Sequence, residues 1–162
     1  MQLGSGVEWA THACTVMALL HEGEGLSAEA LAEYFDVPGA YLAKQLQALR
    51  RAGVVASVRG KHGGYRLACP VDQITLLDIV RAIEGPEPAF RCTEIRRNGP
   101  CGLKPANCRR PCEIAAAFAG AEAAYREALA ARSLASIMLE AAMNSTPEHL
   151  AEMAAWVARR TG

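Results

Sequence analysis

The sequence predicts a mainly α-helical fold with one small β-hairpin. Alanine dominates the second half of the chain, and alanine is the strongest helix former. Apolar residues recur at three- and four-residue steps over several separate stretches, which is the spacing of helices that bury one face. Residues 54–68 instead combine alternating apolar residues with a glycine-rich centre, a pattern that is typical of two strands joined by a tight connection.

The length and composition are those of a globular protein. With 162 residues, of which 51% are apolar, the chain can bury a core as one domain, or as one domain with a helical extension. No apolar run approaches the roughly 18–20 residues that span a bilayer, and the first residues lack a basic start and a cleavable apolar core. These observations predict a cytoplasmic protein without a membrane partner.

The first predicted helix covers residues 7–20 and ends before Gly23. Glu8 and His12 lie four residues apart on it, so their side chains share one face. They could pair with each other or bind one metal ion, and an exposed carboxylate beside a histidine is the commoner case. Trp9 lies between them and is expected to pack in the core.

Two further helices follow, joined by a short turn. Ser27 is a good N-cap for the first of them, which continues to residue 35, and the segment Asp36-Val37-Pro38 ends it. The second covers residues 39–52 and carries basic side chains. A pair of this kind predicts a helix-turn-helix. The expected buried stripe of the second helix is Leu42, Leu46 and Leu49.

A basic-tipped hairpin follows the helix pair. Residues 54–58 and 65–68 are the expected strands, and the segment GKHGG closes them. Between residues 39 and 71 the chain has six lysines or arginines and no acidic residue, although its formal net charge is +0. The pattern predicts a winged helix that binds double-stranded DNA, and the alternative is a small α+β domain whose basic face is merely solvated.

The expected DNA contacts lie at the start of the second helix of the pair and at the hairpin tip. Gln45 can hydrogen-bond an adenine edge, and Lys44 can bind guanine or phosphate. Basic residues at the tip suit the phosphate backbone or the minor groove. The predicted contact residues are Ser27, Tyr41, Lys44, Gln45, Arg59, Lys61 and His62.

A cysteine-rich stretch follows the winged helix. Residues 74–83 form one more predicted helix, capped by Thr75 and stopped by Gly85. The stretch at residues 91–112, RCTEIRRNGPCGLKPANCRRPC, then holds four of the six cysteines. In a reducing cytosol, clustered cysteines are more often metal ligands or redox groups than disulfides. Cys14 and Cys69 are expected to be ordinary packing residues.

Residues 113–143 are predicted to form one long helix and a shorter one after it. An apolar stripe on the long helix is too extensive for so small a domain to cover, and small side chains let two helices approach closely. The stripe predicts a homodimer, which matches a two-fold symmetric DNA operator. A last helix at residues 147–160 is expected to be packed down by Trp156. The stripe consists of Ile114, Phe118, Ala121, Ala124 or Tyr125, and Leu129.

The order of these features resembles that of the bacterial iron–sulfur winged-helix transcriptional regulators, a family that includes IscR and NsrR. The likeness rests on the wing segment GKHGGYRL, the helix ITLLDIVRAIEG, the cysteine-rich loop and the long helix, and it covers nearly the whole chain. The segments GSGVEWATHAC, YLAKQLQALRRAG and PAFRCTEIRRNGP are most similar to the RsrR-type redox sensors. The resemblance implies a redox-sensing regulator of transcription, expected to be a repressor, and not an enzyme.

The resemblance also implies a 2Fe–2S cluster bound between the subunits of the dimer. In RsrR-type members a glutamate and a histidine from the first helix of the partner subunit complete the cluster, and Glu8 and His12 match that pair. A cluster of this kind needs four protein ligands, so two cysteines remain to be assigned. We expect Cys108 and Cys112, with Cys92 as the alternative ligand.

The predicted organisation leaves some choices open. Trp9 is adjacent to the proposed ligand pair and is expected to be redox-coupled, whereas Cys101 stands where the similar regulators lack a cysteine. The alternatives are a zinc-stabilised regulator that uses all four loop cysteines, a cluster regulator that senses nitric oxide, and an enzyme or electron carrier. The expected parts are a winged helix-turn-helix domain at 1–84, a cluster-binding loop at 85–112, and dimerisation and C-terminal helices at 113–162.

Overall fold

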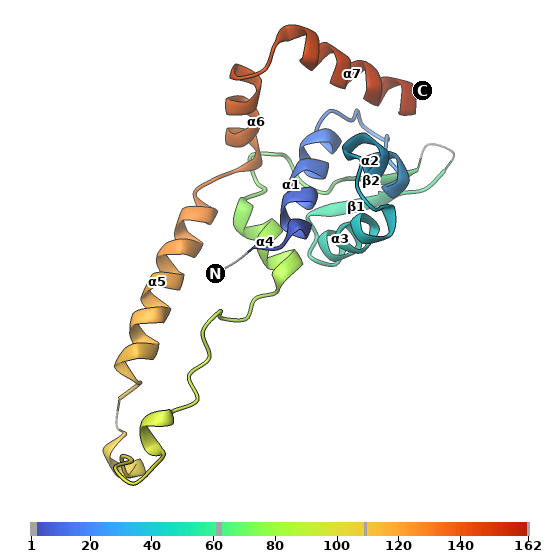
Figure 1. Ribbon diagram of the computed structural model, residues 1–162. Helices are drawn as coiled ribbons and strands as arrows, with labels where there is room; N and C mark the ends of the chain where they lie inside the picture. The colour runs from blue at the N-terminus through green and yellow to red at the C-terminus, as the bar shows by residue number, and fades with distance from the viewer. Residues whose placement is uncertain (1–2, 61–62, 109, 162) are drawn as a thin grey trace.

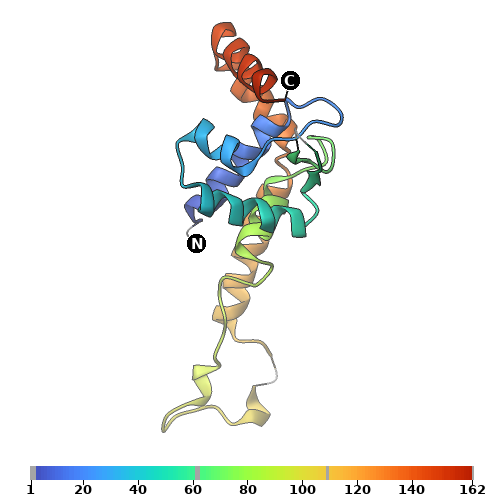
Figure 2. The same cartoon turned by 90° about the vertical axis from the view of Figure 1, so that its right-hand side faces the viewer.

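The computed structural model describes residues 3–60, 63–108 and 110–161. A helical region with a two-stranded hairpin occupies one end of the molecule, and a long helix runs from it to the cysteine-rich loop at the other end (Figures 1 and 2). This confirms the predicted mainly helical fold with one hairpin. The helices are α1 Ser5–Met17, α2 Ala28–Phe35, α3 Gly39–Arg51, α4 Leu76–Glu84, α5 Glu113–Ala130, α6 Leu134–Met143 and α7 Pro147–Thr161, and the strands are β1 Val55–Val58 and β2 Gly64–Leu67.

The core lies among α1, α2, α3 and α4. The predicted stripe of α3, formed by Leu42, Leu46 and Leu49, is fully buried, with 0% exposure of each side chain. Helix α1 adds Cys14 to the same cluster and α4 adds Ile79. Each large apolar side chain that is buried in this way stabilises the fold by about 1.5–3 kcal/mol.

The helix boundaries follow from capping residues. The Ser27 hydroxyl accepts a hydrogen bond from the Ala30 amide at 3.0 Å, which caps α2 as predicted. Asp36, in a left-handed conformation with φ 50°, ends the same helix. Thr75 and Asp78 form a capping box at the start of α4, with the Thr75 amide donating to Asp78 Oδ2 at 2.9 Å.

The hairpin is an antiparallel pair in which Val55 lies opposite Leu67. A third segment joins it, because the Tyr65 amide donates to the Leu26 carbonyl at 2.7 Å and the Leu26 amide donates back at 3.0 Å. Gly64, at φ 151°, lies so close to the Leu26 backbone that a side chain there would collide with it. These contacts tie the wing to the loop before α2.

The residues that follow α5 anchor the C-terminal end of this helix to the winged-helix region. The Leu76 amide donates to the Arg132 carbonyl at 2.9 Å, and the Leu134 amide donates to the Ile74 carbonyl at 2.7 Å. Among the described residues 113–130, which form all of α5, none is buried. The cysteine-rich loop before α5 contains two 3-10 turns, Ile95–Arg97 and Pro105–Asn107.

The last helix folds back onto α2. The Trp156 ring packs edge-to-face against Tyr34, with 4.7 Å between the ring centroids, and Val157 is 3% exposed. Arg160 forms an ion pair with Glu33. The expectation that Trp156 packs this helix down is confirmed. Among the described helices, none is long and apolar enough to cross a membrane.

Candidate functional site

The exposed face of α3 carries part of the predicted DNA-binding set. Tyr41 is 42% exposed and Lys44 is exposed, one turn apart near the start of the helix. Arg59 is exposed where β1 ends and the wing begins. Ser27 is half-buried, and its hydroxyl is already used as the cap of α2. Lys61 and His62 lie outside the described residues.

Gln45 does not lie on the surface where we expected it. Its side chain is 6% exposed and points beneath the start of α1. A Cβ atom added at Gly6 would lie 3.0 Å from Gln45 Cδ, so the absence of a side chain at Gly6 makes the room that Gln45 fills. The expected adenine contact of Gln45 is therefore corrected, because the chain itself covers this side chain.

A second contact joins α1 to α3. The Trp9 ring packs edge-to-face against Tyr41, with 5.1 Å between centroids and 76° between planes. Trp9 is half-buried and packs against the core, as predicted. Trp9 therefore contacts Tyr41 on α3, the predicted DNA-reading helix. In the sequence, Trp9 lies between Glu8 and His12.

Glu8 and His12 are exposed and line one groove of about 490 Å³ between α1, α6 and α7. The His12 ring lies 5.6 Å from the Phe35 ring at an angle of 52°. The remaining wall is mostly apolar, and Thr11, Thr15 and Ser145 are its other polar residues. The apolar residues of the groove include Leu19, Ile137, Met138, Leu150 and Met153.

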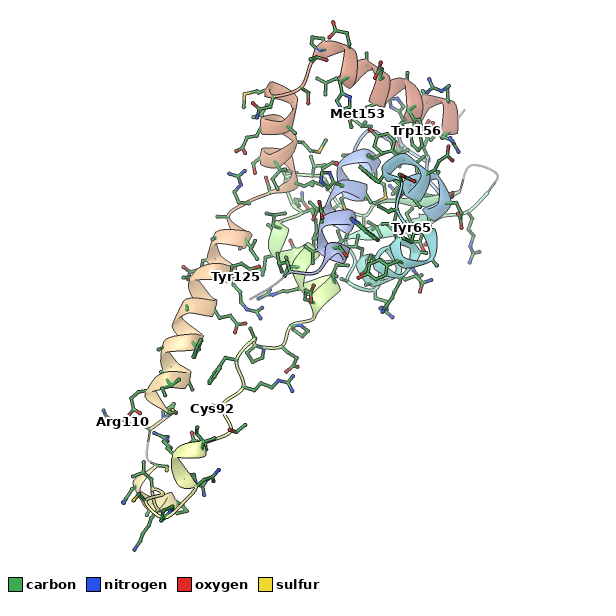
Figure 3. All side chains as sticks on the ribbon, in the orientation of Figure 1. Tyr65, Cys92, Arg110, Tyr125, Met153 and Trp156 are labelled. Carbon is green, nitrogen blue, oxygen red and sulfur yellow. The ribbon has the colours of Figure 1, made fainter. Side chains whose placement is uncertain are left out.

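The loop cysteines lie at the opposite end of the molecule from α1. Cys92 is placed near the far end of α5 in Figure 3, close to Arg110. Cys92 is exposed, whereas Cys108 and Cys112 are half-buried. Within residues 3–60, 63–108 and 110–161 of a single chain, no group of three or more His, Cys, Asp or Glu side chains is arranged to hold a metal ion.

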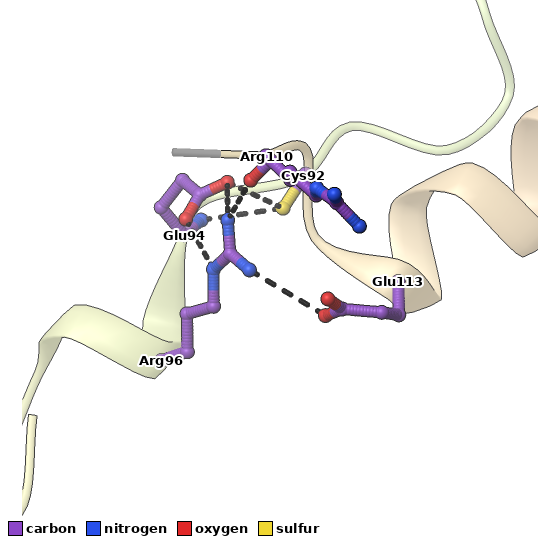
Figure 4. A network of polar contacts seen from close by, with 5 residues as sticks. All are labelled: Cys92, Glu94, Arg96, Arg110 and Glu113. Atoms are coloured by element: carbon purple, nitrogen blue, oxygen red, sulfur yellow. Dashed lines mark hydrogen bonds and ion pairs between the residues drawn. The ribbon is translucent and has the colours of Figure 1, made fainter. Parts of the chain in front are cut away.

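A network of charged groups surrounds Arg96 in this loop (Figure 4). Arg96 Nε donates to Glu94 Oε2 at 2.8 Å, and Nη2 donates to the Arg110 carbonyl at 2.7 Å. Nη1 lies 3.5 Å from Glu113 Oε2, in the first turn of α5. The hydrogen bond from Arg96 lowers the pKa of the Glu94 carboxyl.

Cys112 lies where the loop ends and α5 begins, and its thiol has a lowered pKa. It is the N-cap of α5, and the nearby backbone amides of Ala115 and Ile114 lower the pKa of its thiol. The Arg96 guanidinium and a hydrogen bond with Cys92 lower this pKa further. Thiolates, not thiols, bind metals, so this position suits a metal ligand.

The predicted apolar stripe of α5 divides into two faces. Ile114 is 63% exposed and Phe118 is 52% exposed. Tyr125 and Leu129 are half-buried, and Tyr125 lines a second cavity of about 420 Å³ between α4 and α5. The outer face is made of exposed residues at three- and four-residue steps: Ile114, Ala117, Ala121, Ala124 and Ala128.

The connection from α4 to the loop runs along α5 and is fastened to it. Arg126 Nη2 donates to the Pro86 carbonyl at 3.2 Å and to the Glu87 carbonyl at 3.3 Å. Glu122 pairs with Arg126 at 2.6 Å. The Phe90 and Phe118 rings stack with 4.4 Å between centroids. Residues 86–90 therefore follow α5.

The two remaining cysteines differ from each other. Cys14 is 0% exposed, and burial raises the pKa of its thiol to about 12, so it is a packing residue as predicted. Cys69 is exposed, contrary to expectation. Cys69 lies between the end of β2 at Leu67 and the surface turn that begins with Pro70. It therefore lies outside the core.

Sequence reasoning missed Arg96 and Glu94. The alternation of acidic and basic residues in the segment TEIRR could have indicated a local ion pair. It could not have shown the contacts with Arg110 and Glu113, because these lie 14 and 17 residues further along the chain.

A helix-turn-helix whose second helix carries exposed Tyr41 and Lys44, followed by a hairpin wing, defines a winged-helix regulator. Residues 3–140 match the Rrf2 family, which is described as an iron-dependent transcriptional regulator. This match covers most of the chain, so the protein belongs to the Rrf2 family. The family consists of regulators of transcription and not of enzymes, as expected.

Individual relatives agree with this assignment. CymR (YrzC), the global cysteine regulator of B. subtilis, is 25% identical, with a TM-score of 0.63 over 86% of this chain and 98% of that chain. T. potens IscR is 21% identical, with a TM-score of 0.66 over 90% and 92% of the two chains, which shows a shared fold. The HTH-type regulator slr0846 of Synechocystis is 42% identical over 84 residues, or 52% of this chain. That match spans 57% of the length of slr0846.

Proposed function

We propose that this protein is a homodimeric DNA-binding repressor that senses redox state through a 2Fe–2S cluster held between its subunits. The observation that carries this proposal is the position of the two ligand groups. Cys112 is the N-cap of α5 and Cys108 precedes it in the loop, whereas Glu8 and His12 are exposed on α1, in the region at the opposite end of α5 (Figure 1). The description of the family as iron-dependent supports an iron cofactor.

The donor atoms fit such a cluster. The lowered pKa of Cys112 favours the thiolate that a cluster requires, and the Arg96 charge lies close to both Cys108 and Cys112. Glu8 and His12 of the partner subunit would supply the carboxylate and imidazole, with Cys92 as the alternative thiolate. When bound, the cluster would supply a one-electron redox centre. Replacing two thiolates by harder ligands makes such a centre easier to reduce.

The reading surface in this proposal is the exposed face of α3 together with the wing. Tyr41 and Lys44 would reach bases or phosphates in the major groove of the DNA, and Arg59 would bind the sugar–phosphate backbone beside this groove. Lys61 and His62 belong to the same proposed surface, and Ser27 would approach the backbone from the start of α2. Electrostatic attraction to phosphate then supplies much of the affinity.

The link between the cluster and DNA would run through α1. A change in cluster charge acts on Glu8 and His12, and Trp9 connects the same helix to Tyr41 at 5.1 Å. Gln45, beneath Gly6, gives a second contact between these helices. We propose that Trp9 is displaced when the cluster changes redox state, which changes the position of α3.

The dimer would form along the outer face of α5. Its alanines at positions 117, 121, 124 and 128 are exposed and allow close approach of a second helix. We therefore propose that residues 113–162 contain the dimerisation surface, residues 85–112 the cluster-binding loop and residues 1–84 the DNA-binding domain.

Anaerobic purification followed by visible and electron paramagnetic resonance spectra tests the cofactor. We expect a coloured protein whose reduction by one electron gives a paramagnetic signal of a mixed-ligand 2Fe–2S centre. A colourless protein that contains zinc would contradict the proposal and support the four-cysteine zinc alternative. Loss of DNA binding with nitric oxide, but not with a change of redox state, would support the nitric-oxide alternative.

Single substitutions test the ligand set. Cys108→Ala and Cys112→Ala should each abolish cluster loading, whereas Cys101→Ala should not. His12→Ala should alter or remove the cluster and leave the circular dichroism spectrum unchanged, because His12 is exposed. A wild-type cluster spectrum in His12→Ala would exclude mixed ligation.

A further inference from the structure

Arg96 connects separate segments of the cysteine-rich loop. Its side chain reaches Glu94 on one side and the Arg110 carbonyl and Glu113 on the other, as Figure 4 shows. Its own carbonyl accepts a hydrogen bond from the Leu103 amide at 2.9 Å. One residue therefore joins the beginning, the middle and the end of the loop.

The Arg96 side chain is partly enclosed, although most residues of the loop are exposed. The Arg96 side chain is 20% exposed, whereas the preceding residue, Ile95, is 73% exposed. Glu94 adopts a left-handed conformation with φ 53°, which is uncommon for a residue other than glycine. Such a conformation persists where the surrounding contacts hold it.

Glu94 also connects this network to a thiol. The Glu94 amide donates to Cys92 Sγ at 3.4 Å, and Cys92 Sγ lies 3.9 Å from Glu94 Oε1. Cys108 and Cys112 lie close enough to the Arg96 guanidinium to interact with its charge. Glu94 therefore links Cys92 to Arg96, and the charge of Arg96 also acts on Cys108 and Cys112.

We propose that Arg96 is a positioning residue that closes the loop around Cys92, Cys108 and Cys112 and holds a permanent positive charge beside the cluster-binding thiolates. This inference rests on the proposed cluster and adds to it a residue that is not a ligand. The guanidinium suits the role because its planar fork bonds several acceptors at once and does not lose its charge. A nearby positive charge favours the reduced, more negative state of a cluster and so raises its midpoint potential.

Two substitutions separate the two parts of this role. Arg96→Lys keeps the charge but cannot reproduce the fork, and Arg96→Gln removes the charge. Arg97→Gln is the matched control, because Arg97 is the exposed neighbour in the same turn. Circular dichroism and thermal unfolding would show that all three variants keep the winged-helix fold.

Hydrogen exchange in the cluster-free protein tests loop closure. The Leu103 amide, which donates to the Arg96 carbonyl, should exchange about tenfold faster in Arg96→Gln, which is the factor expected from losing a charge-assisted contact. Arg97→Gln should exchange like the wild type. Equal rates in Arg96→Gln and wild type would overturn the positioning role.

The midpoint potential of the cluster-loaded protein tests the charge. Arg96→Gln should shift the potential to more negative values, whereas Arg96→Lys and Arg97→Gln should retain most of the wild-type potential. A purely structural role would lower loading in both Arg96 variants without changing the potential, and that result would overturn the charge effect. A wild-type protein that binds no cluster would contradict the proposed function, while the exchange experiment would still decide the role of Arg96 in the loop.

Discussion

The winged-helix half and the half formed by the cysteine-rich loop and α5 are stabilised in different ways. In the winged-helix half, Leu42, Leu46 and Leu49 are each 0% exposed and lie in one shared core. In the other half, Ile114 is 63% exposed and Phe118 is 52% exposed. The first half has a complete apolar core, whereas the second presents apolar side chains that a second subunit can cover.

Polar contacts hold the segments of the loop together, whereas buried leucines hold the core together. Arg96 joins the loop segments, and Arg126 fastens residues 86–87 to α5. Ion pairs near the surface stabilise by only about 0–1 kcal/mol each and weaken with salt. The half that contains the loop is therefore easier to open, which suits the sensing role that we propose for it.

The largest expected effect is on the stability of the winged-helix half. Leu46→Ala should lower the free energy of unfolding by about 2–5 kcal/mol, because it leaves a cavity in a closely packed core. Ile114→Ala, the same kind of truncation in the other half, should change it by less than about 0.5 kcal/mol in the monomer. Urea unfolding followed by circular dichroism measures both. Similar losses in the two variants would show that the two halves are stabilised in the same way.

The second-largest expected effect is on the association of two subunits into a dimer. Ala121→Lys places a charge on the outer face of α5 and should raise the dissociation constant of the dimer by at least about tenfold, since a buried unpaired charge is costly. Ala123→Lys, on another exposed face of the same helix, is the control and should leave the dimer intact. Sedimentation equilibrium distinguishes them. An unchanged dimer in Ala121→Lys would move the interface away from this face.

A smaller effect is expected for DNA binding. Arg59→Gln should weaken binding to all sequences by about three- to tenfold and reduce the salt slope by about one, which are the effects of losing one phosphate contact. Arg91→Gln, in the loop half, should have no effect. Fluorescence anisotropy at several salt concentrations measures this. A wild-type salt dependence of DNA binding in Arg59→Gln would show that Arg59 does not contact the DNA.

The smallest expected effect is a shift in reactivity with pH. In the cluster-free protein, the lowered pKa of Cys112 keeps its thiolate present at a lower pH than that of an ordinary thiol. Alkylation of Cys112 should therefore reach half of its maximal rate at a lower pH than alkylation of free glutathione does. Mass spectrometry of the peptide that contains Cys112 measures the rate. A profile that matches glutathione would show that the helix terminus has no influence.

The elements of the winged-helix half were predictable because their signals are local. Ser27 and Thr75 cap α2 and α4 through contacts three residues away, and the leucine stripe of α3 repeats within one helix. The winged helix follows from the order of these elements. The boundaries of the first helix were less accurate, since it ends at Met17 and not at residue 20.

Contacts between distant parts of the chain decided the rest. Gln45 is buried because Gly6, far away in the sequence, has no side chain and leaves space for it. The residues around Gln45 in the sequence do not indicate this contact. Cys69 looked like a core residue because it follows a strand, but the turn after that strand is exposed. The grouping of Cys92, Cys108 and Cys112 around Arg96 depends on a fold of the loop that has no repeating pattern.

Cys14 gives the protein an internal reporter. Its thiol is fully enclosed by the winged-helix core, and its pKa of about 12 keeps it protonated at neutral pH. A thiol-specific label added to the native protein can modify exposed Cys101 but reaches Cys14 only when the core opens. Timed labelling of one sample can therefore record, on separate peptides, the accessibility of the loop and the rare unfolding of the half that holds the predicted DNA-reading helix.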